Sequence, residues 1–490
     1  MPNCDSFVIS FFGILKAGGV VAACNPTYPA EKMQFQINDC DAEIVISMSL
    51  FYNLFKSVQK GTKVKKVIVT NIKEYLPTIA KVLFTLAKEK KGGHRVEIAS
   101  GDIAFQDILT QNAGKKANVT VTPDDLCLFQ YTGGTTGVSK AAIATHKALV
   151  ANMVQNECIM KQFVSPGQQL TFLGAIPFFH VYGIVIVVAL SAYVGGKVIV
   201  IPNARDINDV VDCIDSFKPD LFPGVPALYN AINNHPRIKS GEASLKSLKF
   251  CFSGSAPLPS SVREEFERLS GSKLREGFGM SETPTASHSN PVNGEIRAKS
   301  IGLPLPDMEM KIVSLDDGVT EVPVGDIGEL LMHGPQLMNG YHGMPTETAN
   351  TLRDLEGKKW LFTGDIARMD EDGYFYIVDR KKDMALIGGF NVYPTEVEDA
   401  LKSHPAVLDV GVAAIPNKDK EGMESLKAWV VLQPNSNVTE KELIDHCSKK
   451  LAPYAVPRRI SFIKELPKTT VGKTLRRELI SMELEDLKIK

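Results

Sequence analysis

The chain has 490 residues, of which 44% are hydrophobic and 23% are charged, and its 55 basic and 56 acidic side chains leave a formal charge of -1. This length exceeds what one hydrophobic core usually serves, so we expect two or more domains. The near balance of charge excludes a general attraction to nucleic acid or to an anionic membrane, and binding has to come from local sites.

The first apolar stretch, SFVISFFGILKAGGVVAAC, has Asp5 ahead of it and Lys16 within it. These charges argue against an exported leader, so we predict a buried helix from Phe7 to Lys16 and a strand from Val20 to Cys24. The eight cysteines are dispersed, with no C-x-x-C pair and no cluster at metal-ligand spacing. That usage is typical of a reduced compartment, and we expect a cytoplasmic protein.

Short β-branched runs alternate with helical patterns through the first half of the chain. This alternation predicts the α/β fold class, with parallel or mixed sheets covered by helices and loops at the strand ends forming the site. A turn-rich texture predicts a small β subdomain at about 299–345, and an α+β pattern predicts a smaller C-terminal domain. The predicted strands are EIVIS, KKVIVT, LCLFQY, QLTFLGAIP, GKVIVI, DLFPGVP, LKFCFSG, DVGVAAIP and KAWVVLQP, with C-terminal helices at 395–403 and 440–450.

The segment LPTIAKVLFTLAKEKKGG, residues 76–93, places Ile79, Val82, Leu83 and Leu86 on one helical face and follows them with lysines. A helix packed on the core is the preferred interpretation of such a face. Peripheral contact with a membrane surface is the alternative.

The segment YTGGTTGVSK is stripped of large side chains, and its backbone N–H groups, hydroxyls and Lys140 could close around an anion. It is not a Walker phosphate loop, since Gly137 is followed by Val138 rather than lysine. Taken alone, the match is equally consistent with a flexible Gly/Thr turn.

Seven segments in order resemble the motifs of the adenylate-forming acyl-CoA synthetases, and the long-chain fatty acid branch above all. They are YTGGTTGVSK, PFFHVYG, FSGSAPLP, GFGMSET, TGD, DRKKDMALIGGFNVYPTEVE and PKTTVGKTLRREL, and the resemblance runs from residue 1 to about 480. It implies an acyl-CoA synthetase-like fold with an AMP-binding domain at 1–378, a hinge at 379–382 and a mobile C-terminal domain at 383–490. Ser139 and Ala141 depart from the proline and glycine that are usual in the first motif.

The resemblance implies an ATP-dependent ligase that joins a fatty acid, with long-chain acids expected, to coenzyme A through an acyl-adenylate, with Mg²⁺ as cofactor. Glu282 and Thr132 would hold the metal, and Lys473, Glu282 and Lys140 would be catalytic. The implied ATP-binding residues are Thr132, Gly133, Gly134, Thr135, Thr136, Gly137, Lys140, Gly254, Ser255, Ala256, Pro257, Gly277, Phe278, Gly279, Met280, Ser281, Asp365, Ile377, Arg380 and Lys473.

Further roles follow from the same resemblance. Lys382 would be the hinge, His180 and Gly279 would line the acyl pocket, and Gly388, Gly389 and Phe390 would face coenzyme A. Each position also has an ordinary structural interpretation: Ser281 as a helix cap, Asp365 as a turn residue, Lys382 as part of a solvated charged loop and His180 as a core histidine. The aliphatic run GIVIVVALSAYVGG fits a tunnel wall or a packed core equally well.

Two other functions stay open from the sequence: a ligase for an aryl or amino acid, and an acyl or nucleotide binder without activity. Family members have already run for several dozen residues at the point where this chain starts. From that we expect exposed apolar surface, with a homodimer or aggregation as its consequence. The other expected partners are the fatty acid, ATP and coenzyme A, with no nucleic acid and with membrane contact limited to the inner surface.

Overall fold

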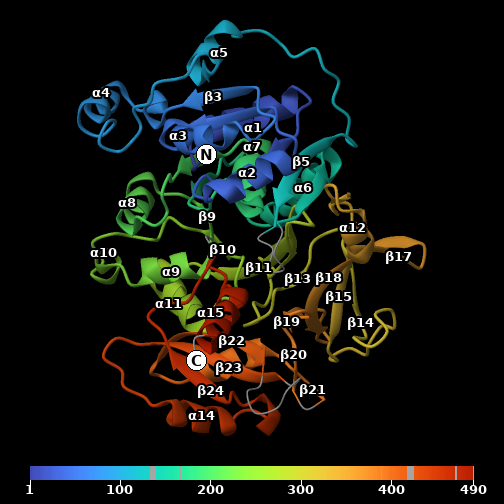
Figure 1. Cartoon of the computed structure of the whole chain (residues 1–490). Helices are drawn as coiled ribbons and strands as arrows, with labels where there is room; N and C mark the ends of the chain where they lie inside the picture. Colours follow the sequence, from blue (N-terminus) through green and yellow to red (C-terminus); the bar gives the residue numbers. More distant parts are fainter. Residues whose placement is uncertain (133–138, 166, 388, 417–423, 470–471, 489–490) are drawn as a thin grey trace.

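The computed structural model describes residues 1–132, 139–165, 167–387, 389–416, 424–469 and 472–488 (Figure 1). Within them, helices and mixed sheets alternate, which confirms the α/β class. The predicted first helix is α1, Asp5–Lys16, with an acidic residue in its first turn and a lysine in its last, as the helix dipole favours. The short strand β1, Val21–Ala22, follows it.

Two sheets are built mainly from the N-terminal part of the chain (blue to cyan in Figure 1), and the later strand β16 joins one of them. One is mixed, in the order β1-β5-β6-β16, and the other is parallel, in the order β2-β3-β4. Their strands are β2 Ile44–Met48, β3 Lys66–Thr70, β4 Ile103–Ala104, β5 Leu126–Tyr131, β6 Ala141–Thr145 and β16 Gly340–Tyr341. The accompanying helices are α2 Ala30–Asp39, α3 Ser49–Gln59, η1 Ile72–Tyr75, α4 Thr78–Ala87, α5 Phe105–Gln111 and α6 His146–Met160.

A seven-stranded sheet in the order β13-β12-β11-β10-β9-β7-β8 forms the centre. The strands from β11 to β8 are parallel, so their carboxyl ends meet at one edge. The strand β12 is antiparallel to both of its neighbours, β11 and β13. The strands are β7 Thr171–Gly174, β8 Lys197–Val200, β9 Leu221–Gly224, β10 Phe250–Ser253, β11 Leu274–Met280, β12 Thr285–Ser289 and β13 Leu303–Pro304. The helices are η2 Gly183–Ala189, α7 Leu190–Tyr193, α8 Ile207–Phe217, α9 Pro226–Asn233, α10 Pro236–Lys239 and α11 Ser260–Ser270.

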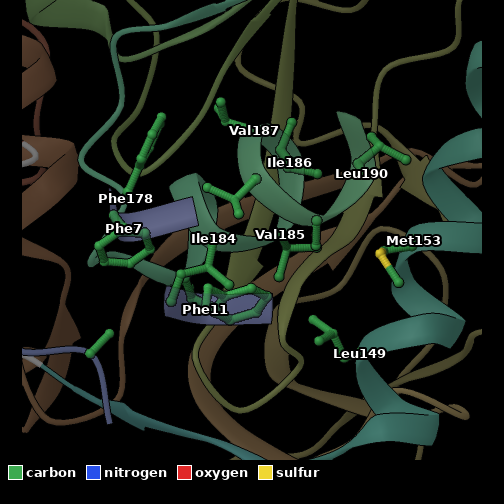
Figure 2. Close-up of a cluster of buried hydrophobic side chains, with 14 of the residues drawn as sticks. Phe7, Phe11, Leu149, Met153, Phe178, Ile184, Val185, Ile186, Val187 and Leu190 are labelled. Carbon is green, nitrogen blue, oxygen red and sulfur yellow. The ribbon is translucent and has the colours of Figure 1, made fainter. Parts of the chain in front are cut away.

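The aliphatic run that begins at Gly183 is the π-helix η2, and every one of its residues is buried. Its side chains pack with Phe7 and Phe11 of α1, with Phe178, and with Leu149 of α6 (Figure 2). This cluster ties α1 to the central sheet, so the run is core in this structure.

A five-stranded antiparallel sheet follows, in the order β14-β15-β18-β17 with β19 paired to β18. It continues to Arg380, whereas the expected subdomain at 299–345 ends before β17 begins. The long strand β18 extends the sheet because its first residues pair with β17 and its last residues pair with β19. The elements are β14 Glu309–Val313, β15 Gly328–His333, α12 Pro345–Thr351, β17 Leu352–Leu355, β18 Lys358–Met369 and β19 Phe375–Arg380.

The C-terminal part (orange to red in Figure 1) holds its own core. A two-stranded hairpin β20-β21 stands beside a sheet in the order β22-β23-β24, and the predicted helices 395–403 and 440–450 are α13 and α14. A capping box between Thr439 and Glu442 starts α14. The elements are β20 Ala385–Ile387, β21 Phe390–Val392, α13 Pro394–Lys402, β22 Val407–Pro416, β23 Glu424–Leu432, α14 Glu440–Ser448, η3 Pro453–Ala455, β24 Arg459–Phe462 and α15 Arg476–Lys488.

The helix α4 corrects one preferred interpretation. It forms within the predicted segment 76–93, but it does not pack on the core: Ile79 and Leu86 are 78% and 81% exposed. None of its residues, all of which the structure describes, is buried. Periodicity marks an apolar face but cannot say what covers it, which is why the sequence favoured the wrong alternative. Among the described helices, none has the length and hydropathy to cross a membrane.

Candidate active site

The carboxyl ends of β9, β10 and β11 form one wall of the candidate site. The backbone N–H of Gly254, just after β10, donates to the carbonyl of Gly224 at the end of β9 over 3.2 Å. A Cβ placed on Gly254 would lie 3.6 Å from the carbonyl oxygen of Gly277 in β11. Parallel pairing therefore brings the two predicted ATP-binding segments 254–257 and 277–281 side by side. Ser255 has φ of 70°, in the left-handed region.

Gly279 sits at a bulge in this wall. The register between β11 and β12 shifts between Phe278 and Gly279, and a Cβ on Gly279 would stand 1.6 Å from the carbonyl oxygen of Thr285. No side chain fits there, so glycine is required. The neighbouring ring of Phe278 meets His288 edge-on, with centroids 6.1 Å apart.

Asp365 and Arg380 face each other across paired strands. They are register partners on β18 and β19, and Arg380 Nε lies 3.0 Å from Asp365 Oδ1. The charge of Asp365 raises the pKa of Arg380. The other carboxylate oxygen, Oδ2, is buried and has no hydrogen-bond partner within the described part of the chain. An orphaned buried oxygen is costly, so this atom is placed to accept hydrogen bonds from a ligand.

Lys473 reaches this cluster from the C-terminal part of the chain. Burial lowers its pKa to about 8, assisted by repulsion from Arg380 and opposed by the charge of Asp365. Its turn is held by the Thr469 N–H, which donates to the Lys473 carbonyl over 2.8 Å. Gly472 lies against α9, since a Cβ on it would be 3.8 Å from the Cβ of Ala227. The turn therefore docks on the N-terminal part and carries the ammonium inward.

A second charged group contains Glu282 and Lys140. The phenol of Tyr341 donates to Oε1 of buried Glu282 over 2.7 Å. The Lys140 ammonium lies 5.2 Å from the centroid of the Tyr341 ring and forms an ion pair with Glu347 of α12. The charge of Glu282 helps to raise the pKa of Arg380, and the charge of Lys140 helps to lower the pKa of Lys382. These interactions link this group to the Asp365 cluster.

The base of the Gly/Thr loop is closed by its two ends. Thr132 N–H donates to the Lys140 carbonyl over 2.8 Å, and the Ser139 hydroxyl donates to the Thr132 carbonyl over 2.7 Å. Proline, the usual residue of the motif, has no such donor, so Ser139 supplies a bond of its own. The predicted phosphate ligands Gly133, Gly134, Thr135, Thr136 and Gly137 lie outside the described residues.

The fit to Mg²⁺ depends on Glu282. Among the described residues, no group of three or more His, Cys, Asp and Glu side chains is placed to hold a metal ion. One carboxylate that is hydrogen-bonded by Tyr341 suits a Mg²⁺ that draws most of its ligands from phosphate and water. Glu282 therefore fits a metal brought by a nucleotide, and the part of Thr132 as a second ligand stays a prediction.

His180 lies at the amino side of η2. Its Nδ1 accepts from the Tyr182 N–H at 3.3 Å, and dense surroundings lower its pKa to about 4, so the ring is neutral at physiological pH. The phenol of Tyr182 donates to the Phe252 carbonyl of β10 over 3.2 Å. His180 thus has a local structural partner, and its role in an acyl pocket stays a prediction.

The remaining predicted residues are dispersed around this centre. Ile377 is on β19 and packs against the core of the five-stranded sheet. Burial, with repulsion from Arg380, lowers the pKa of the predicted hinge residue Lys382. Phe390, at the start of β21, is exposed and stacks on Tyr454 with centroids 4.4 Å apart. Gly389 has φ of 88°, and Gly388 falls outside the described residues.

Beside the predicted hinge, Arg476 gathers four acceptors. Its guanidinium contacts Asp379 and Asp383 at 3.1 Å each, Glu398 at 3.0 Å and the Thr395 hydroxyl at 3.0 Å. Burial disfavours its charged form, but the three carboxylates together raise its pKa. This residue joins both sides of the segment 379–383 to α13.

The sequence analysis missed Tyr341, Glu347 and Arg476. The first two stand in GYHGMPTET, and the third is in the same motif as Lys473, but no spacing rule links them to their partners. Only the pairing of β16 with β6 brings Tyr341 to Lys140. Chain order therefore contained no signal for these contacts.

Comparisons with known proteins show which family this chain is similar to. The AMP-binding enzyme family matches residues 1–342, and the AMP-binding enzyme C-terminal domain matches residues 396–473. The chain is 38% identical to a long-chain-fatty-acid–CoA ligase of Bacillus subtilis, over 100% of this chain and 86% of that one. It is 36% identical to a long-chain-fatty-acid–CoA ligase of Escherichia coli, over 98% and 84%. A solved anthranilate CoA ligase in complex with anthranoyl-AMP is similar with a TM-score of 0.82 and 27% identity, over 99% of this chain and 87% of that one.

Proposed function

Because the chain belongs to the AMP-binding enzyme family, we propose that it activates a long-chain fatty acid to its acyl-CoA in two steps at the site described above. A carboxylate oxygen attacks the α-phosphorus of ATP, the bond to the β-phosphate oxygen breaks, and pyrophosphate leaves. The thiolate of coenzyme A then attacks the carbonyl carbon of the acyl-AMP, and AMP leaves with the electron pair. The thiol proton passes to solvent.

One observation carries the proposal: residues from both parts of the chain converge on the same charged centre. Asp365 and Arg380 of the five-stranded sheet pair with each other, and their charges act on Lys473 of the C-terminal part. Phosphoryl transfer needs positioned positive charge more than covalent chemistry from the protein. An ammonium held in a buried position serves that need because low local polarity strengthens its field.

Each residue has a proposed task. The free Asp365 oxygen accepts from the ribose hydroxyls, while Arg380 orients that carboxylate and contacts the sugar. Lys140 exchanges Glu347 for the terminal phosphates, and Lys473 bridges the substrate carboxylate and the α-phosphate. When bound, Mg²⁺ would be held by Glu282 and would neutralise charge on the phosphate oxygens.

The test is pyrophosphate release with a panel of acids, run with ATP and Mg²⁺ and then with coenzyme A added. We expect release that depends on palmitate and thioester formation on addition of coenzyme A. Preference for an aryl or amino acid would show that the protein is the alternative ligase, which activates such acids. Nucleotide binding without release for any acid would make it a binder.

Asp365→Ala is expected to weaken ATP and AMP binding alike, by about 1–3 kcal/mol or roughly 5- to 150-fold, since the ribose hydroxyls lose their acceptor. Glu282→Ala should impair turnover of Mg·ATP and spare AMP, which needs no metal here. Isothermal titration with each nucleotide measures the affinities, and pyrophosphate release with palmitate measures the turnover. Unchanged AMP affinity in Asp365→Ala, in protein that melts as a folded chain, contradicts the assignment.

Adenylate formation is expected to fall as the pH rises through about 8. Burial lowers the pKa of Lys473 to about 8 in the free enzyme, so the ammonium is present below that pH and lost above it. The pH profile of kcat/KM for ATP, followed by ATP–pyrophosphate exchange without coenzyme A, reports the free enzyme. Lys473→Arg keeps its charge and should lose this alkaline limb. A limb that persists unchanged in the arginine variant assigns it to another group.

A further inference from the structure

Helix α4 presents an apolar ridge made of Ile79, Val82, Leu83 and Leu86. These side chains recur at helical spacing on one face, and between 52% and 81% of each is exposed. Monomeric proteins commonly expose single apolar residues, but a contiguous ridge of this kind marks an interaction surface. In Figure 1 the helix projects at the edge of the molecule, at the end opposite the C-terminal part.

The opposite side of α4 is fixed to the protein. The ring of Phe84 meets His94 edge-on with centroids 5.4 Å apart, and Glu89, just after the helix, is buried and paired with Lys73. Asn71 donates to Glu89 over 3.2 Å and to the His94 carbonyl over 3.0 Å. The ridge therefore points outward because local packing and hydrogen bonds hold its other side.

The charges around the ridge are of one sign. Between residues 76 and 95 the only acidic side chain is Glu89, which the Lys73 ammonium neutralises. The exposed cations of the segment are Lys81, Lys88, Lys90, Lys91 and Arg95. Apolar side chains flanked by lysines complement a lipid surface with negative headgroups, where the former enter the acyl boundary and the latter remain among the phosphates. A protein groove would more often require acidic partners placed for each cation.

We infer that α4 docks this protein on an anionic lipid bilayer, lying in the interface with its ridge buried and its lysines at the headgroups. The choice of lipid rests in part on the proposed function, because long-chain fatty acids partition into bilayers and an enzyme docked there meets them at high local concentration. The attachment is reversible, since one short helix buries little area.

The test is cosedimentation of the full chain with vesicles of phosphatidylcholine and phosphatidylglycerol, against vesicles of phosphatidylcholine alone. Binding to the anionic vesicles should exceed binding to the neutral ones and fall with salt. Ile79→Glu/Leu86→Glu should reduce the partition coefficient by about tenfold or more. Replacing each of Lys81, Lys88 and Lys91 by Gln should cost roughly fivefold per charge. The matched control is Val319→Glu/Val324→Glu, which adds the same charge at two other exposed apolar side chains and should bind as the parent does.

Equal binding by the ridge variant and the parent overturns the inference, as does absence of binding by the parent. If light scattering shows that the parent dimerises and the ridge variant does not, a second copy covers the ridge, which also overturns it. Pyrophosphate release with octanoate, a soluble acid, should be the same in all variants. A failure of the parent to release pyrophosphate with palmitate would contradict the proposed function and leave the vesicle result standing on its own.

Discussion

Lys473→Ala is expected to lower the rate of acyl-adenylate formation by about 10²–10³, the usual cost of removing one well-placed charge donor from a transition state. Lys473 is partly buried, and Asp365 and Arg380 lie near enough for their charges to act on its ammonium. A neutral water in its place would not supply the positive charge. ATP–pyrophosphate exchange with palmitate measures the loss directly.

The same variant should still make acyl-CoA when it is given ready-made acyl-AMP, if the C-terminal part presents a different face for the second step. Lys468→Ala is the matched control, because this lysine belongs to the same turn but pairs with Asp409 at the surface. In the expected two-pose scheme, the C-terminal part turns about Lys382 from an adenylate-forming pose to a thioester-forming pose. Lys382→Pro should show the opposite defect, since a fixed φ hinders this rotation and leaves the adenylate-forming pose reachable. If Lys473→Ala and Lys382→Pro damage the same half-reaction, the two-pose scheme does not apply to this protein.

Arg476→Ala should destabilise the C-terminal part by about 3–5 kcal/mol, because removing one partner leaves buried carboxylates without compensation. Asp379 is almost completely buried, and burial already raises the pKa of Glu398 despite the guanidinium. Chemical denaturation followed by fluorescence of Trp429, which is in this part of the chain, reports the change.

The matched control for this prediction is Arg477→Ala, the exposed neighbour on the same helix, with an expected effect of less than about 0.5 kcal/mol. Arg476→Lys should be intermediate, since an ammonium satisfies fewer of the acceptors than the planar guanidinium. Equal destabilisation by the alanine variants at 476 and 477 would mean that the network seen around Arg476 contributes nothing to stability.

The motifs assigned Asp365 and Arg380 to the same nucleotide site, and the structure places the two side chains in contact. Asp365 and Arg380 are 15 positions apart in sequence, and the β18–β19 hairpin makes them register partners. Patterning did not predict β18 and β19, which lie beyond the expected β subdomain at 299–345, and it could not predict their register, which depends on where the turn and the bulge after Ile366 fall. The sequence could not predict that Oδ2 of Asp365 lacks a hydrogen-bond partner, because this depends on which groups the fold places around the atom.

The two apolar runs that form η2 and α4 also show what a sequence pattern cannot predict. Both were compatible with core packing, and η2 is core whereas α4 is exposed. The difference lies in neighbours distant in sequence: α1 and Phe178 cover η2, while α4 packs mainly on the segment that adjoins it. Hydrophobic periodicity records the preference of a helix face for apolar surroundings, and the tertiary fold decides whether the protein supplies them.

The bulge at Gly279 restricts how this protein can evolve. A side chain there would meet the backbone of Thr285, which cannot move without breaking the pairing of β11 with β12. Even alanine is excluded, so the pairing of β11 with β12 fixes this position as glycine whatever ligand the site holds. A mutant library that leaves codon 279 invariant therefore loses no viable variants.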